Sequence, residues 1–185
     1  PDESYIAFTE VDEAPVEVIT RSEIYADEIK MIEQKYPKAG TPNVIIKLAV
    51  QNIESGKRQW IDTGIEQDIY IARGKWMPDS EHFTYQWQSR DQQTVKLLVS
   101  AAPPAKGPVA LKELFAETDA AWVELHDDIR FLKDGRIIWP SERNGTRQLY
   151  LVSADGKTFT ALTLGADPVT KIVALDQEGG RVLYE

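Results

Sequence analysis

Short runs of hydrophobic and β-branched residues alternate with turn residues along this chain, and the most regular series lies between Trp122 and Gly165. Asp134-Gly135, Asn144-Gly145 and Asp155-Gly156 divide that series into consecutive runs. Asn-Gly and Asp-Gly supply the positive φ angles that tight hairpins need. The pattern therefore predicts a four-stranded antiparallel meander, which is the unit of a propeller blade, with strands at 129–133, 136–143, 146–152 and 158–163.

The same arrangement recurs upstream and, in part, at both ends of the chain. A second unit contains the turn 76–80, a polar turn and a Pro/Gly-rich turn at 101–108. The further strands are expected at 5–9, 44–50, 58–63, 82–88, 94–100, 109–115, 171–176 and 181–184. Recurrent units of this length favour a radial array over a sandwich.

The predicted fold class is all-β, a partial β-propeller of about three to four blades made of antiparallel four-stranded meanders. Residues 1–185 are expected to form a single propeller fragment. Because propellers close with about 4–8 blades, both ends are expected to cut through a blade of a longer protein. The expected units are an incomplete blade at 1–64, whole blades at 65–118 and 119–165, and the first hairpin of a further blade at 166–185.

Residues 11–43 form a long insertion between strands of the first blade, which blade geometry does not require. A connection of this length in a compact β array is usually a functional loop or a contact arm. Its apolar residues could fold back on the blade or dock on another chain, since exposed apolar patches mark contact surfaces. These residues are Ile24, Tyr25, Ile29, Met31, Ile32 and Tyr36.

Composition and charge fit a globular β protein and narrow its partners. The 185 residues are 42% hydrophobic and 28% charged, and the net charge is −9. Nucleic acids and anionic membrane surfaces require clustered Lys and Arg, so neither is an expected partner. No apolar run reaches the length of a membrane span. The absence of cysteine excludes disulfides and thiol catalysis but leaves the compartment open.

Catalytic and metal-binding motifs are not found. No serine lies in a Gly-x-Ser-x-Gly motif, and the two histidines are far apart. His82 is expected to be a half-exposed strand residue, His126 follows Glu124-Leu125, and Asp127-Asp128 are expected to be turn residues. We therefore expect no catalytic residue, no metal site and no cofactor within this chain.

Several segments together resemble the N-terminal propeller of dipeptidyl peptidase IV, with the bacterial branch most similar. The most specific is Tyr-Pro-Lys-Ala-Gly-Thr-Pro-Asn at 36–43, and the others are at 1–15, 76–80, 85–87 and 141–150. The resemblance implies a serine exopeptidase that removes N-terminal X-Pro or X-Ala dipeptides. It also implies an eight-bladed propeller that covers a C-terminal α/β-hydrolase domain with a Ser-Asp-His triad. Because that domain lies outside these residues, this fragment is expected to be inactive by itself.

The resemblance also implies roles for two segments and for the parent protein. The insertion that ends at 36–40 corresponds to an arm that reaches a second subunit, which implies a homodimer. The loop that begins at Trp122-Val123 faces the substrate pocket, so the expected lining residues are Trp122, Glu124, His126 and Asp127. A pair of glutamates that captures the substrate amine precedes Pro1 in the family, and Asp12-Glu13 is not that pair. The implied partners are the remaining blades, the hydrolase domain and a peptide substrate, in a periplasmic or otherwise extracytoplasmic location.

Two other classes of protein are alternatives. The first is a stand-alone periplasmic binding propeller of the TolB type, which shares the Asp-Gly hairpins and the ending at 162–165. The 36–40 segment argues against it, because a binding array has no need of that insertion. The second is a β enzyme that uses paired carboxylates, as glycosidases do.

Overall fold

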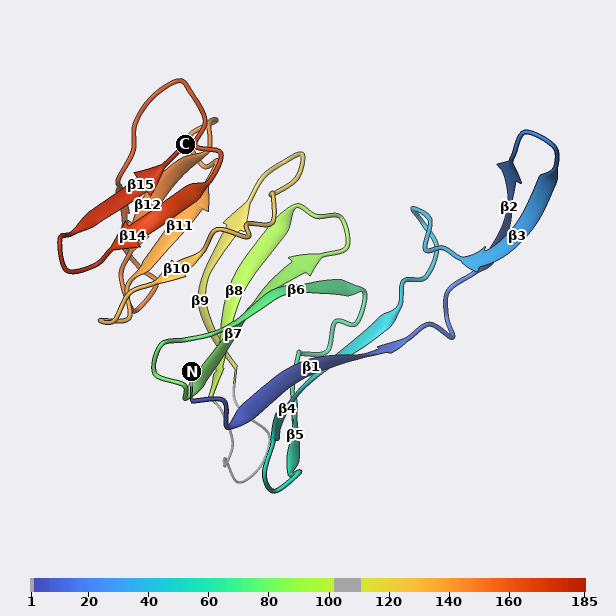
Figure 1. The fold of residues 1–185 in the computed structure, drawn as a ribbon, viewed down its shortest axis with the longest axis horizontal. Coiled ribbons are helices and arrows are strands. Elements are labelled where there is room, and N and C mark those ends of the chain that lie inside the picture. The colour runs from blue at the N-terminus through green and yellow to red at the C-terminus, as the bar shows by residue number, and fades with distance from the viewer. Residues whose placement is uncertain (1, 102–110) are drawn as a thin grey trace.

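A computed structural model describes residues 2–101 and 111–185, and within them the chain forms fifteen β-strands and no helix (Figure 1). These ranges therefore contain no helix that is long and apolar enough to cross a membrane. The expected turn at 101–108 and the start of the expected strand at 109–115 lie mostly outside the described residues. The all-β prediction is confirmed.

Both predicted whole blades are four-stranded antiparallel meanders. The first has the strand order β6-β7-β8-β9 and the second has the order β10-β11-β12-β13. Gly135, Gly145 and Gly156 have φ angles of 84°, 88° and 78°, which confirms the three hairpin signals. The strands are β6 (Ile69–Trp76), β7 (His82–Ser89), β8 (Thr94–Ala101), β9 (Lys112–Thr118), β10 (Arg130–Phe131), β11 (Ile137–Ser141), β12 (Gln148–Val152) and β13 (Phe159–Ala161).

The two outer sheets have fewer than four strands. The first is three-stranded, with β1 (Tyr5–Asp12), β4 (Ile45–Asn52) and β5 (Arg58–Ile61), and the last is the hairpin of β14 (Ile172–Asp176) and β15 (Arg181–Tyr184). Val11 pairs with Ile46 and Asp12 with Ile45, so both belong to β1. The insertion therefore begins at Glu13, two residues later than the expected boundary, because the β1–β4 pairing continues to Asp12, the last residue of β1.

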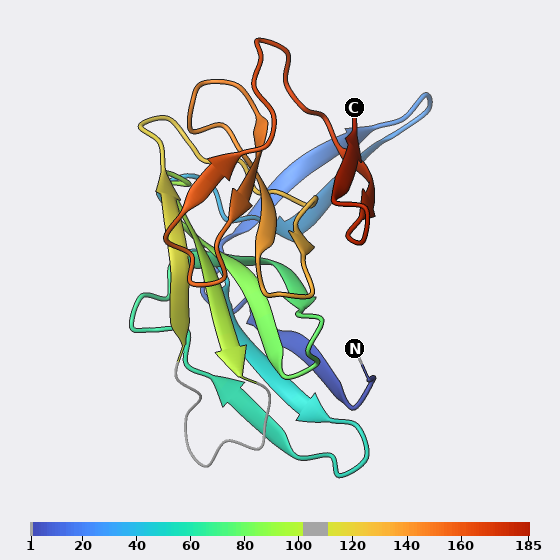
Figure 2. The same ribbon diagram turned by 90° about the vertical axis from the view of Figure 1, so that its left-hand side faces the viewer.

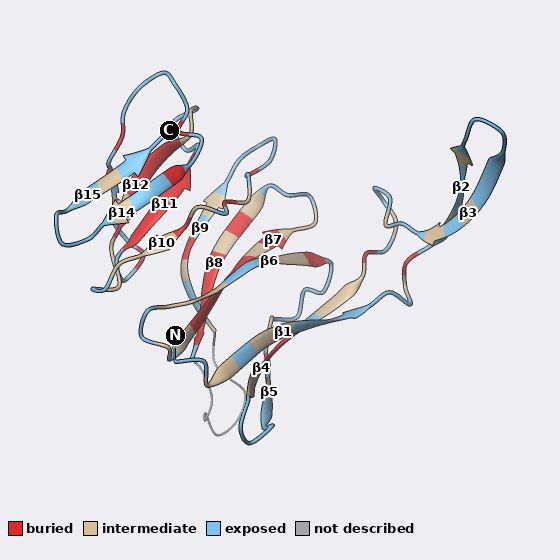
Figure 3. Cartoon of the chain, in the orientation of Figure 1, coloured by how far each residue is buried: buried red, intermediate tan, exposed pale blue. Residues whose placement is uncertain are grey.

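Hydrophobic clusters lie between successive sheets. Figure 2 shows how the sheets are arranged, and Figure 3 shows the buried residues along the strands of the two four-stranded sheets. Tyr85 of β7 packs with Leu48 of β4 between the first two sheets. Leu97 of β8 packs with Trp139 of β11 between the next two, and Ile138 packs with Ile172 between the last two. Each fully buried side chain of this size stabilises the fold by about 1.5–3 kcal/mol relative to its exposed state.

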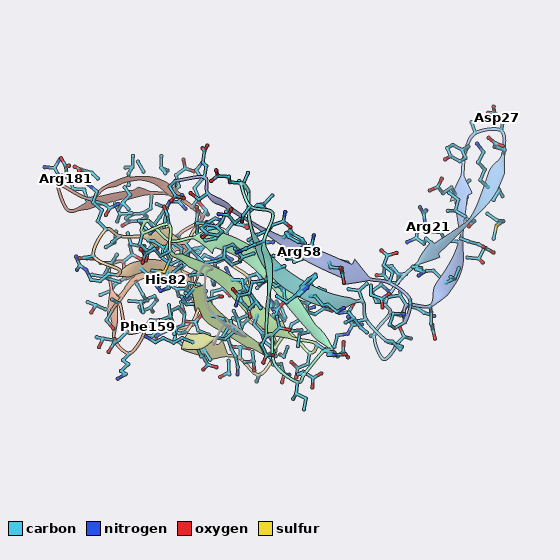
Figure 4. All side chains as sticks on the ribbon, turned by 90° about the horizontal axis from the view of Figure 1, so that it is seen from below. Arg21, Asp27, Arg58, His82, Phe159 and Arg181 are labelled. Atoms are coloured by element: carbon cyan, nitrogen blue, oxygen red, sulfur yellow. The ribbon has the colours of Figure 1, made fainter. Side chains whose placement is uncertain are left out.

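The insertion forms a separate hairpin of β2 (Val18–Ile24) and β3 (Ile29–Lys35), called the arm below. Figure 1 shows it projecting away from the stacked sheets, and Figure 4 shows Asp27 at its tip and Arg21 along its length. Ile24 is 78% exposed and Met31 is 66% exposed. The arm therefore does not fold back on the blade, which excludes the first of the two alternatives for its apolar residues.

One hairpin glycine is enclosed by the neighbouring sheet and provides a test of the packing. A Cβ added at Gly156 would lie 2.1 Å from the carbonyl oxygen of Leu114, whereas one added at Gly145 would meet nothing within 4 Å. Both residues have positive φ, so Gly145→Ala should cost only the backbone strain of about 1–2 kcal/mol. We expect Gly156→Ala to lower the free energy of unfolding by about 2 kcal/mol more, because the neighbouring backbone must also move. Urea denaturation of both variants measures the difference, and equal costs would contradict this packing.

Candidate functional site

The segment between β9 and β10, residues 119–129, contains all four expected pocket residues and is called the site loop below. It connects the second sheet to the third without regular secondary structure. Trp122 is 59% exposed, and Glu124 and Asp127 are also exposed, whereas His126 is only 4% exposed. The structure thus brings the four residues together on one loop, with three side chains toward solvent and one packed beneath.

Two buried glutamines of β7 hold the site loop from below. The Gln86 side chain donates a hydrogen bond to the carbonyl of His126 at 2.7 Å and accepts one from its backbone N–H at 3.2 Å. Gln88 donates to the carbonyl of Val123 at 2.9 Å. Because these backbone groups are buried, loss of a partner would leave them unsatisfied at a cost of about 1–3 kcal/mol each.

The sequence did not identify these glutamines as part of the site. They occupy alternate positions of β7, and such positions are read as the solvent face of a half-buried strand. The face is instead covered by the site loop and by the third sheet, so both side chains are buried. The available signal was that two amide side chains, rather than charged ones, alternate in a strand with the aromatic residues Phe83, Tyr85 and Trp87.

His126 is packed as a neutral aromatic residue. Its ring meets the ring of Trp139 edge-on, with the centroids 5.5 Å apart. Burial lowers the pKa of the imidazole, and Arg147 lowers it further, whereas Glu117, Glu142 and Glu124 oppose the shift. In the described part of the chain no hydrogen bond joins the ring to a carboxylate or a serine, so no catalytic triad is assembled.

His82 lies elsewhere, at the start of β7. Its Nδ1 is 2.7 Å from the Oδ2 atom of Asp79 in the preceding turn, and both side chains are about half exposed. This confirms the expectation of a half-exposed strand residue. The same turn aspartate accepts backbone hydrogen bonds from Glu81 and His82.

Two clefts flank the site loop. One has a volume of about 500 Å³ and is lined by Trp122, Glu124 and His126 together with residues of β9 and of the β11–β12 turn. The other, of about 360 Å³, is lined by Arg73, Glu124, His126 and Asp127 and by residues of β12 and β14. The His126 and Glu124 side chains border both clefts, so a ligand in either would contact the site loop.

Asp127 and Asp128 are more than turn residues, because each is tied to another blade. The Asp127 carboxylate forms an ion pair with Arg73 of β6. The Asp128 carboxylate accepts hydrogen bonds from Arg130 and from the backbone N–H of Ile172, both at 2.9 Å. No group of three or more His, Cys, Asp or Glu residues in the described ranges could hold a metal ion.

Successive antiparallel sheets joined face to face, together with a loop that lines clefts between them, define a segment of a β-propeller. The chain belongs to the family of the dipeptidyl peptidase IV N-terminal region, whose sequence model matches residues 1–185. The resemblance noted from the sequence is therefore confirmed, and the match favours this family over a stand-alone binding propeller.

Individual relatives agree with the family. Over its whole length, the chain is 26% identical to a protein designated a dipeptidyl peptidase 4 in Aspergillus flavus. The aligned region is 26% of the length of that protein. A crystal structure from Bacteroides ovatus, assigned as a dipeptidyl aminopeptidase IV, superposes with a TM-score of 0.81 at 25% identity and covers 98% of this chain and 28% of that one. Porphyromonas gingivalis dipeptidyl peptidase 4 has the same fold, with a TM-score of 0.80 at 23% identity over 96% of this chain and 25% of that one. The chain thus spans about a quarter of the length of these relatives.

The lowered pKa of His126 predicts a pH-dependent stability. In the unfolded chain the imidazole binds a proton near pH 6.5, but in the folded protein it resists protonation until the pH is lower. Between these two pKa values the unfolded state binds more protons, so the free energy of unfolding should fall as the pH decreases below about 6.5. Substitution His126→Phe keeps an aromatic ring against Trp139 and should remove this component, as measured by urea denaturation across the pH range. The control His82→Gln should retain it, and an unchanged pH dependence in His126→Phe would contradict the prediction.

Proposed function

We propose that this chain is the non-catalytic propeller segment of a dipeptidyl peptidase IV-like serine exopeptidase, which releases N-terminal X-Pro or X-Ala dipeptides. In this proposal the propeller shapes the access of peptides to an α/β-hydrolase domain that these residues do not include. The observation that carries it is the site loop, which is fixed by the buried glutamines and borders two clefts. We also propose an extracytoplasmic location, periplasmic in a bacterium, which rests on the family alone.

The proposed lining residues are Trp122, Glu124, His126 and Asp127. Trp122 offers an exposed aromatic face for a peptide side chain, and Glu124 offers a carboxylate. These groups contact parts of the peptide away from the bond that is cleaved. Such contacts are made equally in the ground state and the transition state, so their removal should change KM more than kcat.

A kinetic comparison in the full-length protein tests the proposal. We expect the full-length protein to release dipeptides from Ala-Pro peptides and residues 1–185 alone to release none. Asp127→Ala should raise KM for longer peptides severalfold, on the order of three- to tenfold, with kcat nearly unchanged. Glu54→Ala removes an equal charge from the exposed β4–β5 turn and serves as the control. Absence of dipeptide release by the full-length protein would reject the proposed function.

The arm supports a second part of the proposal, namely that two copies of the protein associate through it. Cross-strand pairing places Val18, Ile24, Ile29 and Met31 on one face of the hairpin, and each is more than half exposed. Tyr25 and Tyr36 are 50% exposed at the two ends of the hairpin, and Ile32 lies half-buried on the other face. A projecting apolar face of this kind marks a contact surface.

The base of the arm is held in a fixed direction by one arginine of the β7–β8 turn. Arg90 donates to the carbonyls of Pro37, Lys38 and Thr41 at 3.2–3.4 Å, and to the hydroxyl of Tyr70 at 2.6 Å. Its side chain is only 21% exposed. This anchoring supports an arm that is oriented for docking, because less conformational freedom is then lost on association.

Charge substitutions on the two faces of the arm test this part. Met31→Asp places a carboxylate on the apolar face and should weaken homodimerisation at least about tenfold, because the charge would be buried without a partner. Gln34→Asp places the same charge on the opposite face and serves as the matched control. Sedimentation velocity over a concentration series gives both dissociation constants. A monomeric wild-type protein, or equal effects of the two substitutions, would exclude the arm as the dimer contact.

A further inference from the structure

Strand β6 contains a bulge with an unusual backbone. Ala72 pairs with Gln86 and Lys75 pairs with Thr84, so Arg73 and Gly74 together lie opposite a single residue of β7. Arg73 has a φ angle of 52°, in the left-handed region that L-residues rarely adopt. A bulge of this kind redirects side chains, and such strained residues persist only where the surrounding contacts maintain them.

Glycine is required next to the strained arginine. A Cβ at Gly74 would lie 2.5 Å from the Cζ atom of Phe83, in the hydrophobic cluster between the first two sheets. The Thr84 hydroxyl also donates to the carbonyl of Lys75 at 3.0 Å. The packing of β7 thus fixes the bulge from one side, and the side chains of Arg73 and Lys75 are directed by it.

Both side chains reach the site loop, more than fifty residues away in sequence. The Arg73 guanidinium forms the ion pair with the Asp127 carboxylate. The Lys75 ammonium donates to the carbonyl of Asp127 at 2.6 Å and to that of Ile129 at 3.4 Å. Two adjacent cations of one strand therefore hold both the side chain and the main chain of the loop.

The environment of Lys75 makes these contacts necessary. Burial lowers the pKa of its ammonium group, and the positive charges of Arg130 and Arg73 act in the same direction, whereas Asp128 and Asp127 oppose them. A partly buried cation needs hydrogen-bond acceptors, and the two loop carbonyls provide them. Movement of the loop would leave the charge without these acceptors.

The opposite side of the loop is held by the next blade. Asp128 accepts from the backbone N–H of Ile172 in β14, and Arg130 donates to the carbonyl of the same residue at 3.2 Å. With Gln86 beneath, residues 126–129 are fixed from three directions, by two strands of the second sheet (β6 and β7) and by β14 of the last sheet. The bulge supplies the contacts that neither β7 nor β14 provides.

We propose that Arg73 and Lys75 are positioning residues for the candidate substrate pocket, and that Arg73 also sets its selectivity by neutralising the Asp127 carboxylate. This inference rests on the proposed function, since it concerns the same loop. A peptide that reaches the loop meets an ion pair rather than a free negative charge. Without Arg73, the Asp127 carboxylate would favour peptides with Lys or Arg at that position.

The first test uses the full-length protein with Lys75→Met and the conservative variant Lys75→Arg. Lys96→Met is the matched control, because Lys96 of β8 forms a surface ion pair with Glu113 of β9 rather than a hydrogen bond to the site loop. Hydrogen exchange of the amides of residues 126–129 reports the loop directly, without any substrate. We expect Lys75→Met to accelerate exchange about tenfold and to raise KM for longer peptides with kcat within about twofold. Lys75→Arg should restore both values, and Lys96→Met should leave them unchanged.

The second test is a charge exchange between the two partners of the ion pair. Arg73→Asp places two carboxylates together, and Asp is a residue that tolerates the left-handed conformation of this position. We expect the single substitution to shift preference toward cationic peptides by about tenfold in kcat/KM, and Arg73→Asp combined with Asp127→Arg to reverse that shift.

The outcomes separate this inference from the proposed function. Unchanged exchange and unchanged kinetics in Lys75→Met would overturn the positioning role. Faster exchange with unchanged kinetics would overturn it as well, because the loop would then be held for stability alone. Faster exchange in Lys75→Met, in a full-length protein whose wild type releases no dipeptide, would support the contacts and reject the proposed function instead.

Discussion

The two four-stranded sheets of this protein have to bury both of their faces, and the remaining architecture follows from that requirement. All five residues of β11 are buried, and so are five of the eight residues of β8, where Leu98 belongs to the cluster on one side of the sheet and Leu97 to the cluster on the other. A single antiparallel sheet with two apolar faces is not stable in water. Each sheet therefore requires a neighbour on either side, and the chain satisfies this by placing consecutive meanders face to face.

Within this stack, buried polar side chains determine the path of the connecting segments. Thr84, Gln86 and Gln88 occupy one face of β7, where aliphatic residues would bury more apolar surface. Their hydrogen bonds go to the β6 bulge and to the site loop. Because a buried polar group must find a partner, these residues accept only one arrangement of the segments above them. The candidate site thus depends on the interior of the blade as much as on its own residues.

The sequence predicted the meanders well because their signal is local. Asp134-Gly135 or Asn144-Gly145 decides a hairpin by the φ angle that a single glycine can adopt. The predicted strand ends were less accurate. Strand β11 was expected to reach residue 143 but ends at Ser141, and the carbonyl of Glu142 already accepts a turn hydrogen bond from the backbone N–H of Gly145. The arm was not predicted as a hairpin, because the residues between its strands, such as Ala26 and Asp27, contain no glycine signal.

The bulge in β6 could not be predicted for a different reason. The conformation of Arg73 depends on the Phe83 ring, on the neighbouring loop and on Asp127, which are distant in sequence. Local patterns contain no information on such contacts. By contrast, the position of the site loop could be expected from the family resemblance, although its buried supports could not.

The enclosure of Gly156 also affects where the chain can change in length. Its turn rests against the main chain at Leu114 of the neighbouring sheet, whereas the turns at Gly145 and Gly180 have open space around them. An inserted residue at the β12–β13 turn would have to displace a whole blade, but inserted residues at the other two would extend into solvent. Labels, epitope tags or natural insertions are therefore compatible with the β11–β12 and β14–β15 turns, and the β12–β13 turn acts as a spacer that sets the distance between blades.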